Sequence, residues 1–362
     1  MTIPGYLIWN GNPEIYTFTV PLTEREVTLR WYGLLFALGF LISQQILYYI
    51  YRREGKPESD VDQLTLYMVV ATIIGARLGH VLFYEPDIYL REPLKILKIW
   101  EGGLASHGAA AAILFALWIY ARKKKPGQGY FQVVDRIVIL VALTGALIRL
   151  GNFFNSEIIG KPTHDTAGVV FARSVTEALE RSGRVEDVSF VKVDSAVNEN
   201  GFPPVKMLVD FAPAAGSMQH MNVALNRISA FQEPRHHIDI TSAFIPKIIP
   251  EEDNTSSAIV FMYMIPRHPA QLYESLSCFL LFLILLWMWS RDRERTPPGR
   301  LLGTFLIVCF GLRFVFEFIK EPQVTFESNM ALNMGQLLSI PLFLAGILIL
   351  MMSFRKQESR YE

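Results

Sequence analysis

The sequence predicts an all-α polytopic membrane protein with seven transmembrane helices and a small outward-facing α/β or β insertion domain. Three observations predict this class. Of the 362 residues, 51% are hydrophobic and only 19% are charged. The apolar residues come in blocks of about 20, the length that a helix needs to cross the hydrocarbon core of a bilayer. Clusters of basic residues follow every second block.

Seven apolar blocks are long enough to be spans, although His107 interrupts the third and Arg149 interrupts the fourth. A polar stretch separates the fourth span from the fifth. The chain is therefore expected to comprise a membrane domain over 1–160, an insertion domain over 161–266 and a second membrane domain over 267–362. In chain order, the predicted spans are 29–51, 64–84, 104–121, 134–153, 269–290, 300–319 and 334–354.

The insertion contains short runs in which apolar and polar residues alternate, namely VSFVKV, VKMLVDF and the more apolar IVFMYMI. Such runs are typical of β-strands, whose side chains point alternately to the two faces of a sheet. The insertion is therefore predicted to fold as a small domain outside the membrane.

The basic loops predict the orientation. Lys and Arg cluster after spans one, three, five and seven. Short loops rich in these residues stay on the cytoplasmic side. We therefore expect the N-terminus and the insertion outside, and the C-terminus in the cytoplasm. The N-terminus lacks a basic region followed by an apolar core, so no cleavable signal peptide is expected.

Several classes of site find no support in the sequence. The formal net charge is zero, which argues against a nucleic-acid partner. Cys278 and Cys309 both lie in apolar runs and form no disulfide framework or zinc motif. There is no metal-binding cluster, Walker loop or dinucleotide fingerprint, so neither a metal nor a cofactor is expected. The oligomeric state is left open.

Polar residues recur at one predicted depth, toward the outer side of six spans. A charged residue inside the membrane costs at least a few kcal/mol, so it indicates a functional site. Together these residues predict a polar cavity that opens to the outer leaflet. They are Tyr32, Arg77, His80, His107, Arg149, Asn152, His268, Gln271, Arg313 and Glu317.

Single members of this set also have structural interpretations. Arg313 and Glu317 are four residues apart, the spacing of a neutralising ion pair on a helix. Tyr32 has the position of an interfacial aromatic anchor. Arg77 is close enough to the predicted outer interface to extend to headgroups, and His107 is equally consistent with helix packing. The small residues Gly75 and Gly79 predict close helix packing.

The residue types in this cavity favour phosphate chemistry. A guanidinium group binds two phosphate oxygens at once, and two arginines of the predicted cavity, Arg149 and Arg313, offer such groups. Glu157 and Glu317 are expected to orient them, while Asn152 and Asn155 donate hydrogen bonds. His107 is suited to moving a proton near neutral pH. The combination predicts transfer chemistry on a phospholipid of the membrane.

Five segments, in this order along the chain, resemble the prolipoprotein diacylglyceryl transferase family. IRLGNFFNSEIIG at 148–160 is similar to the family signature, G-R-x-G-N-F-x-N-x-E-x-x-G. The other four are LRWYGLLFALGF at 29–40, GGLASHGA at 102–109, RHPAQLYE at 267–274 and RFVFEFIKEP at 313–322.

The resemblance implies a reaction, two substrates and a location. The diacylglyceryl group of phosphatidylglycerol would be transferred to the thiol of the lipobox cysteine in the signal-peptide region of a prolipoprotein. The products would be a thioether and glycerol phosphate. The enzyme would lie in the bacterial inner membrane, with its active site toward the outer leaflet.

The resemblance also implies roles for individual residues. Arg149 and Arg313 would neutralise the leaving phosphate, and His107 would deprotonate the thiol. Tyr32 would position the substrate, although an arginine-centred mechanism without a histidine base stays open. The residues expected to contact phosphatidylglycerol are Arg149, Asn152, Asn155, Glu157, Gly160, Glu317 and Arg77.

The chain departs from the family pattern in three places. Ile148 precedes the signature arginine where the family has glycine, and Cys309 stands where the family often has tyrosine. The insertion is also longer than the outward arm expected of the family. The alternative functions are a membrane transporter or channel for an anionic solute and a signalling receptor. A transporter would more often show internal repeats, and none is visible.

Overall fold

The computed structural model describes residues 5–21, 25–98, 102–165, 167–181, 183–211, 236–239, 245–250, 256–322 and 330–358, together with positions 223 and 228. The chain divides into two compact units. The first unit comprises Met1–Leu35, Arg149–Glu274 and Val315–Asn333, and the second comprises Phe36–Ile148, Ser275–Phe314 and Met334–Glu362.

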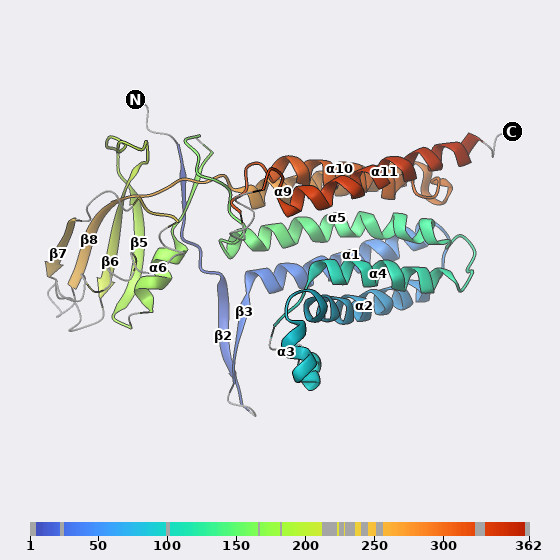
Figure 1. The fold of residues 1–362 in the computed structure, drawn as a ribbon, viewed down its shortest axis with the longest axis horizontal. Coiled ribbons are helices and arrows are strands. Elements are labelled where there is room, and N and C mark those ends of the chain that lie inside the picture. Colours follow the sequence, from blue (N-terminus) through green and yellow to red (C-terminus); the bar gives the residue numbers. More distant parts are fainter. Residues whose placement is uncertain are drawn as a thin grey trace. The chain divides into compact units, whose positions relative to one another are not determined.

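Each of the seven predicted spans coincides with a helix. These helices are α1 (Trp31–Arg53), α2 (Ser59–Phe83), α4 (Ser106–Ala121), α5 (Tyr130–Phe154), α9 (Ala270–Asp292), α10 (Arg300–Phe316) and α11 (Met334–Glu358). Figure 1 shows how the parts of these helices within the second unit run alongside one another. The short elements α3 (Pro86–Arg91) and η1 (Pro93–Leu97) join α2 to α4, and η3 (Arg293–Arg295) follows α9.

Five of the helices in the described part of the chain are long and apolar enough to cross a membrane, namely α1, α2, α5, α9 and α11. The other two are apolar but shorter, with 16 residues in α4 and 17 in α10. Helix α4 begins after the start of its predicted span, and α10 ends before the end of its predicted span. The chain is therefore mostly helical with at least five candidate spans, and the count of seven stays a prediction.

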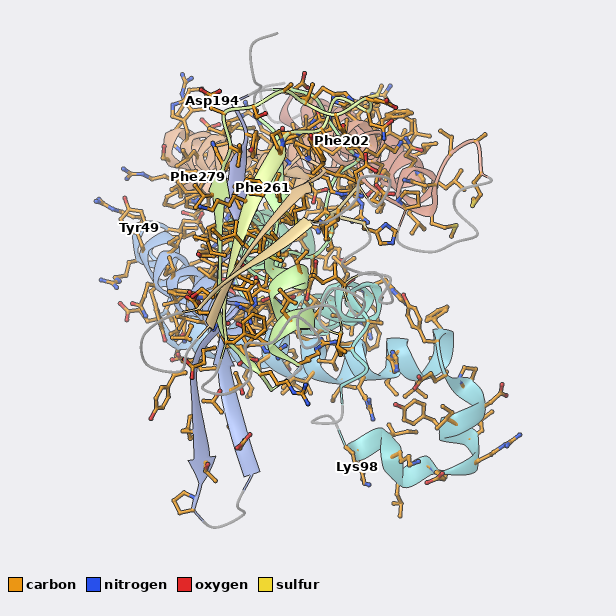
Figure 2. The ribbon with its side chains drawn as sticks, turned by 90° about the vertical axis from the view of Figure 1, so that its left-hand side faces the viewer. Tyr49, Lys98, Asp194, Phe202, Phe261 and Phe279 are labelled. Atoms are coloured by element: carbon orange, nitrogen blue, oxygen red, sulfur yellow. The ribbon has the colours of Figure 1, made fainter. Side chains whose placement is uncertain are left out.

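The helices of the second unit share one apolar core. Its buried side chains include Leu47 of α1, Leu64 of α2, Leu117 of α4 and Ile139 of α5. Other apolar side chains of these helices stay exposed, among them Tyr49 of α1 and Phe279 of α9, which Figure 2 labels. Apolar surface on the outside of an apolar core is what a lipid-facing helix bundle requires.

Small residues bring α2 and α4 into close contact, as Gly75 and Gly79 predicted. A Cβ atom on Gly75 would lie 2.3 Å from the Cβ of Ala112 and 2.6 Å from the carbonyl oxygen of Gly108. A Cβ on Gly79 would lie 2.8 Å from the Cα of Gly108. The two backbones approach to distances that only glycine permits.

The first unit holds the strands. β1 (Leu7–Trp9) pairs in parallel with β4 (Val169–Phe171), and β2 (Glu14–Val20) pairs antiparallel with β3 (Arg25–Arg30). Four antiparallel strands form a sheet in the order β5-β6-β8-β7, with bounds Val185–Lys192, Pro204–Phe211, Ser256–Tyr263 and Ile245–Pro250. Helix α6 (Arg173–Glu180) lies beside this sheet (Figure 1).

The three alternating runs of the insertion are confirmed as strands, because they fall on β5, β6 and β8. Their inward side chains form a second core, which includes Val188, Met207 and Val260 and is closed by Val175 and Leu179 of α6. The sequence did not predict the β2–β3 hairpin. Its short strands precede the first apolar block and carry exposed residues such as Tyr16 and Leu29, so no buried face marks them.

Candidate functional site

The predicted signature forms the last turns of α5 and a tight loop behind them. The amide of Ser156 donates a hydrogen bond to the carbonyl of Phe153. The amide of Glu157 donates to the carbonyl of Asn152 at 3.0 Å. Ser156 and Ile158 have positive φ angles of 55° and 56°. These left-handed residues turn the chain sharply, so the loop places the Glu157 side chain back beside the helix end.

The two signature asparagines hold Glu157. The Nδ2 of Asn152 donates to Oε2 of Glu157 at 3.3 Å, and the Nδ2 of Asn155 donates to Oε1 at 3.1 Å. Gln271 fixes the same residue through its backbone, because its Nε2 donates to the Glu157 carbonyl at 2.5 Å. The asparagines were predicted to donate to substrate, and here they orient a carboxylate.

A chain of alternating charges surrounds Arg149 in the first unit. The Nε of Arg149 lies 2.9 Å from Oε2 of Glu274, although its N–H is not aimed well enough at that oxygen for a hydrogen bond. The other oxygen of Glu274 lies 2.5 Å from Nζ of Lys320. Lys320 in turn lies 3.0 Å from Oε1 of Glu317, whose Oε2 accepts from Asn333.

This chain of charges leaves part of Arg149 accessible. The side chain of Arg149 is 23% exposed, whereas those of Glu274 and Lys320 are 7% and 4% exposed. Within the residues that the structure describes, the two terminal nitrogens of Arg149 donate no hydrogen bond, and the contact of its ion pair with Glu274 is made at Nε. The guanidinium is therefore held by its Nε side, and its terminal nitrogens remain able to bind an anion.

Glycines set the spacing around the signature. A Cβ on Gly160 would lie 2.4 Å from the carbonyl oxygen of His268, to which the Gly160 amide donates at 3.0 Å. A Cβ on Gly151 would lie 3.0 Å from the Cα of Tyr32. A side chain at position 160 would therefore collide with the backbone of His268, so glycine is required there. Tyr32, in the first turn of α1, is near enough to Glu157 and Arg149 to interact with both electrostatically.

Arg267, the first residue of RHPAQLYE, ties the loop to the insertion. Its Nη1 donates to the Gly160 carbonyl at 3.1 Å and to Oε2 of Glu321 at 2.7 Å. Its Nε and Nη2 donate to the His236 carbonyl at 3.1 and 2.6 Å. Arg267 is thus a structural brace between the end of the signature and a segment about 30 residues before RHPAQLYE.

Three predicted site residues belong to the second unit. His107 is an exposed residue in the first turn of α4, where the ring of Phe83 meets it edge-on at 5.0 Å. Arg313 lies in the last turn of α10. Arg77 of α2 is buried beneath the Tyr89 ring, with its carbon Cζ 4.9 Å from the ring centroid.

All the hydrogen-bond donors of the Arg77 guanidinium are used within the protein. Its guanidinium makes five hydrogen bonds to backbone carbonyls, which belong to Lys95, Ile96, Lys98, Gly102 and Gly103. A fully bonded guanidinium has no donor left for a phosphate. In this structure Arg77 therefore fixes the segment between η1 and α4, rather than extending toward headgroups or a lipid substrate.

The structure brings together Tyr32, Arg149, Asn152, Asn155, Glu157, Gly160 and Glu317 in the first unit. It also adds two residues to which the sequence analysis gave no role, Glu274 and Lys320. Both lie in segments that resemble the family, RHPAQLYE and RFVFEFIKEP. That position was the available signal, but a carboxylate and an amine so far apart in the chain gave no reason to pair them. Among the described residues, no group of three or more potential ligands has the geometry of a metal site.

Comparisons with known proteins identify the family of this chain. A family model described as prolipoprotein diacylglyceryl transferase matches residues 20–352. The chain belongs to this family. Curated relatives carry the name phosphatidylglycerol–prolipoprotein diacylglyceryl transferase. One from Tolumonas auensis is 33% identical over 97% of this chain and 99% of its own length. Others from Chloroherpeton thalassium and Porphyromonas gingivalis are each 33% identical, over 99% and 96% of this chain and 98% and 94% of their own lengths.

Family membership, together with the apolar helices, makes the chain a multi-pass membrane protein and a transferase of lipoprotein biosynthesis. The residues matched by the family model include the whole signature and the partners of Arg149, from Tyr32 to Lys320. The alternative functions, a transporter or a receptor, find no support in these relatives.

Proposed function

We propose that this protein transfers the diacylglyceryl group of phosphatidylglycerol to the thiol of a prolipoprotein lipobox cysteine. The curated relatives are named for this reaction. The observation that carries the proposal is the state of Arg149, whose Nε lies 2.9 Å from Glu274 while its terminal nitrogens donate no hydrogen bond to the described residues. A planar guanidinium presented in this way matches two oxygens of a phosphodiester.

The transfer breaks one bond and forms one. The thiolate sulfur attacks the glyceryl carbon that carries the phosphate, and a carbon–sulfur bond forms. The bond between that carbon and the phosphate oxygen breaks, and glycerol phosphate leaves with the electron pair. Arg149 stabilises the negative charge that develops on the leaving phosphate, in a site that excludes much of the water. Arg313 is proposed to share this role.

Glu274 and Lys320 position Arg149. The short contact between Lys320 and Glu274 fixes one carboxylate oxygen and directs the other to Nε of Arg149. Glu317 stabilises Lys320 from its other side. Glu317 was predicted to orient an arginine directly, and we now propose that it acts on Arg149 through Lys320 and Glu274. Asn152 and Asn155 are proposed to set the Glu157 carboxylate against the glycerol hydroxyls of the headgroup.

The thiol must lose a proton, because its pKa of about 8.5 leaves a minor thiolate fraction at neutral pH. We propose His107 as the base, since it is exposed at the start of α4 and accessible to substrate. Transfer is proposed to occur at the outer leaflet of the bacterial inner membrane, with the N-terminus outside and the C-terminus in the cytoplasm. The basic loops of the seven-span arrangement support this orientation.

The reaction is tested with the purified full-length protein in vesicles that contain phosphatidylglycerol labelled in its diacylglyceryl part. A lipobox peptide is added, and labelled peptide is measured by mass spectrometry. The wild type should produce a thioether-linked diacylglyceryl peptide and one glycerol phosphate per turnover. A wild type that labels no peptide contradicts the proposed function.

The base is tested separately with His107→Gln. If His107 removes the thiol proton, the acidic limb of the pH profile of kcat/KM should move from the histidine range to the thiol pKa, so that the variant is slow at neutral pH and recovers activity as the pH rises toward about 8.5. An unchanged rate and pH profile would exclude His107 and favour the arginine-centred alternative.

A further inference from the structure

A polar cavity of ≈ 770 Å³ lies within the first unit, next to the signature loop. Its volume falls in the range of small-molecule and peptide-side-chain sites, about 300–1,000 Å³. The described lining includes loop residues 155–159, one side of α6, and His236 and His237 of the insertion. Glu157 is therefore shared between this cavity and the transfer site, whereas α6 and the two histidines are not needed for transfer at Arg149.

Four polar atoms in the lining are buried and have no hydrogen-bond partner among the described residues. They are Oδ1 of Asn155, Oγ of Ser156, Oγ of Ser174 and Nδ1 of His237. His237 is only 5% exposed. Each such atom costs about 1–3 kcal/mol when it stays unpaired. Hydrogen bonds to a ligand bound in this cavity would remove that cost.

The ligand indicated by these atoms is polar but uncharged along much of its length. The two hydroxyls can donate or accept, the amide oxygen accepts, and the imidazole nitrogen does one or the other according to its tautomer. Burial lowers the pKa of His237 to about 3, with smaller contributions from Arg267 and His236, so its ring is neutral at physiological pH. A peptide main chain presents N–H and C=O groups in alternation and matches such a lining.

The charges of the cavity argue against a phospholipid headgroup. The described lining carries five glutamates and three arginines. The arginines are also engaged by carboxylates: Arg30 lies 3.0 Å from Glu14, and Arg173 lies 3.0 Å from Glu177. An excess of carboxylates repels an anionic phosphate and favours a neutral or basic segment.

Hydrogen bonds of Arg267 connect the cavity wall to the signature loop. Arg267 donates to the carbonyl of His236 in the cavity wall and, through Nη1, to the carbonyl of Gly160 at the end of the signature loop. Glu157 belongs to the cavity lining and accepts hydrogen bonds from Asn152 and Asn155 of the signature. A ligand in the cavity therefore contacts the same loop that carries the Glu157 carboxylate.

We propose that this cavity binds the polar segment of the prolipoprotein that directly follows the lipobox cysteine. The proposal rests on the transferase function above. A signal peptide is apolar up to its processing site, and the chain beyond that site is an ordinary polar polypeptide. The cavity takes this polar chain and thereby sets the position of the cysteine thiol relative to the transferred group.

The test compares two lipobox peptides with the full-length protein in phosphatidylglycerol vesicles. One peptide ends at the cysteine, and the other continues with six polar residues. The wild type should use the extended peptide with a kcat/KM about tenfold higher, as expected if several net hydrogen bonds form. Equal values for the two peptides would overturn the proposal, whereas labelling of neither peptide would mean that the proposed function itself has failed.

Ser174→Trp fills the cavity from the second residue of α6. In this variant the ratio of the two kcat/KM values should fall from about tenfold to near one, mainly through a higher KM for the extended peptide. Ser189→Trp is the matched control, because Ser189 is an exposed residue of β5 outside the cavity lining. It should keep the wild-type ratio. A change in the KM for phosphatidylglycerol in Ser174→Trp would assign the cavity to the headgroup and overturn the proposal.

A cross-linking measurement keeps the test decisive if Ser174→Trp does not fold. A photo-reactive residue is placed three positions after the cysteine of the extended peptide, and the wild-type adduct is mapped by mass spectrometry. Adducts should fall on residues 155–159, 173–181 or 236–237. Adducts only on other parts of the protein would exclude this cavity as the binding site.

Discussion

Helix α5 carries two arginines in very different surroundings. Arg136, near its start, is 1% exposed and donates twice to Oε1 of Glu54, at 2.9 and 2.8 Å, and also to the carbonyls of Gln132 and Arg293. Arg149, near its end, is 23% exposed and has one ion-pair contact, with Glu274. Both interrupt the same apolar run in the sequence.

The environment of Arg136 is complete. Glu54 also accepts from Nε1 of Trp289 at 2.7 Å and from Nζ of Lys56 at 2.6 Å. Burial alone would raise the pKa of Glu54, but Arg136 and Lys56 together hold that pKa below its usual value. Every partner in this cluster belongs to the protein and its side chains are buried, so the cluster stabilises the second unit and is not accessible to a ligand.

The difference shows how a structural charge is distinguished from a binding charge. Both arginines carry a desolvation cost. At Arg136 the protein offsets this cost with two hydrogen bonds to one carboxylate oxygen and two to carbonyls. At Arg149 it supplies one carboxylate, and we propose that the terminal nitrogens bind the substrate anion. The number of partners, rather than the presence of the charge, indicates function.

The largest expected effect is kinetic and concerns the binding arginine. Arg149→Lys keeps the positive charge but loses the planar fork, so two phosphate oxygens can no longer be bound together. Transfer should fall by about 10²–10³-fold, the usual cost of losing a preorganised charge-stabilising donor. The rate is measured with labelled phosphatidylglycerol and a lipobox peptide, and the melting temperature should stay close to that of the wild type. A variant with the full rate would contradict the role of Arg149.

The structural arginine predicts the opposite pattern. Glu54→Gln leaves Arg136 and Lys56 buried without a carboxylate, which should cost about 3–5 kcal/mol of stability. The free energy of unfolding is measured by denaturant titration in detergent, and the rate per folded molecule should not change. Glu58→Gln is the matched control, since its pair with Arg52 is exposed and should contribute less than about 1 kcal/mol. Equal losses in the two variants would remove the distinction drawn here.

Glu274 sharpens the comparison, because it acts through Arg149. Glu274→Gln removes the charge that holds Nε of Arg149 and the partner of Lys320. We expect kcat to fall by about 10–100-fold, the cost of losing a supporting contact to a functional group. The KM for the peptide should not change. A purely structural role for Glu274 would lower the melting temperature and leave kcat per folded molecule intact.

The smallest effect is on stability and concerns His237. Its pKa is lowered to about 3 in the folded protein, whereas an unfolded histidine has a pKa of about 6.5. Between these values the unfolded chain binds a proton that the folded chain does not. Stability is therefore complete above about pH 6.5 and decreases by up to about 1.4 kcal/mol per unit as the pH falls toward 3. His237→Gln should weaken this acid dependence, measured as the melting temperature at pH 7 and pH 5. An identical pH dependence in both proteins would exclude a buried neutral His237.

Local patterns determined much of the fold. Blocks of about 20 apolar residues predicted the positions of the seven helices, because the length of a hydrophobic run and its internal hydrogen bonding are local properties. Alternation predicted β5, β6 and β8 for the same reason. The signature segment predicted Arg149, Asn152, Asn155, Glu157 and Gly160 as site residues without any structure.

The partners of these residues were decided by tertiary structure alone. Glu274 and Lys320 are 125 and 171 positions beyond Arg149, and no periodicity relates them to it. The asparagines were expected to face substrate and instead hold Glu157, because the left-handed turn at Ser156 and Ile158 returns the carboxylate to the helix end. Arg77 was expected near a headgroup, but backbone carbonyls of η1 and of Lys98, Gly102 and Gly103 accept all its donors.

The sequence by itself therefore determined where the helices lie along the chain and which family they belong to. Only the tertiary structure decided which buried charges are satisfied by the protein and which remain for a ligand. The physical reason is the separation along the chain of the residues that each property depends on. Helix formation and partition into a membrane depend on neighbouring residues, whereas the pairing of a charge depends on which distant side chain folding places within about 3 Å of it.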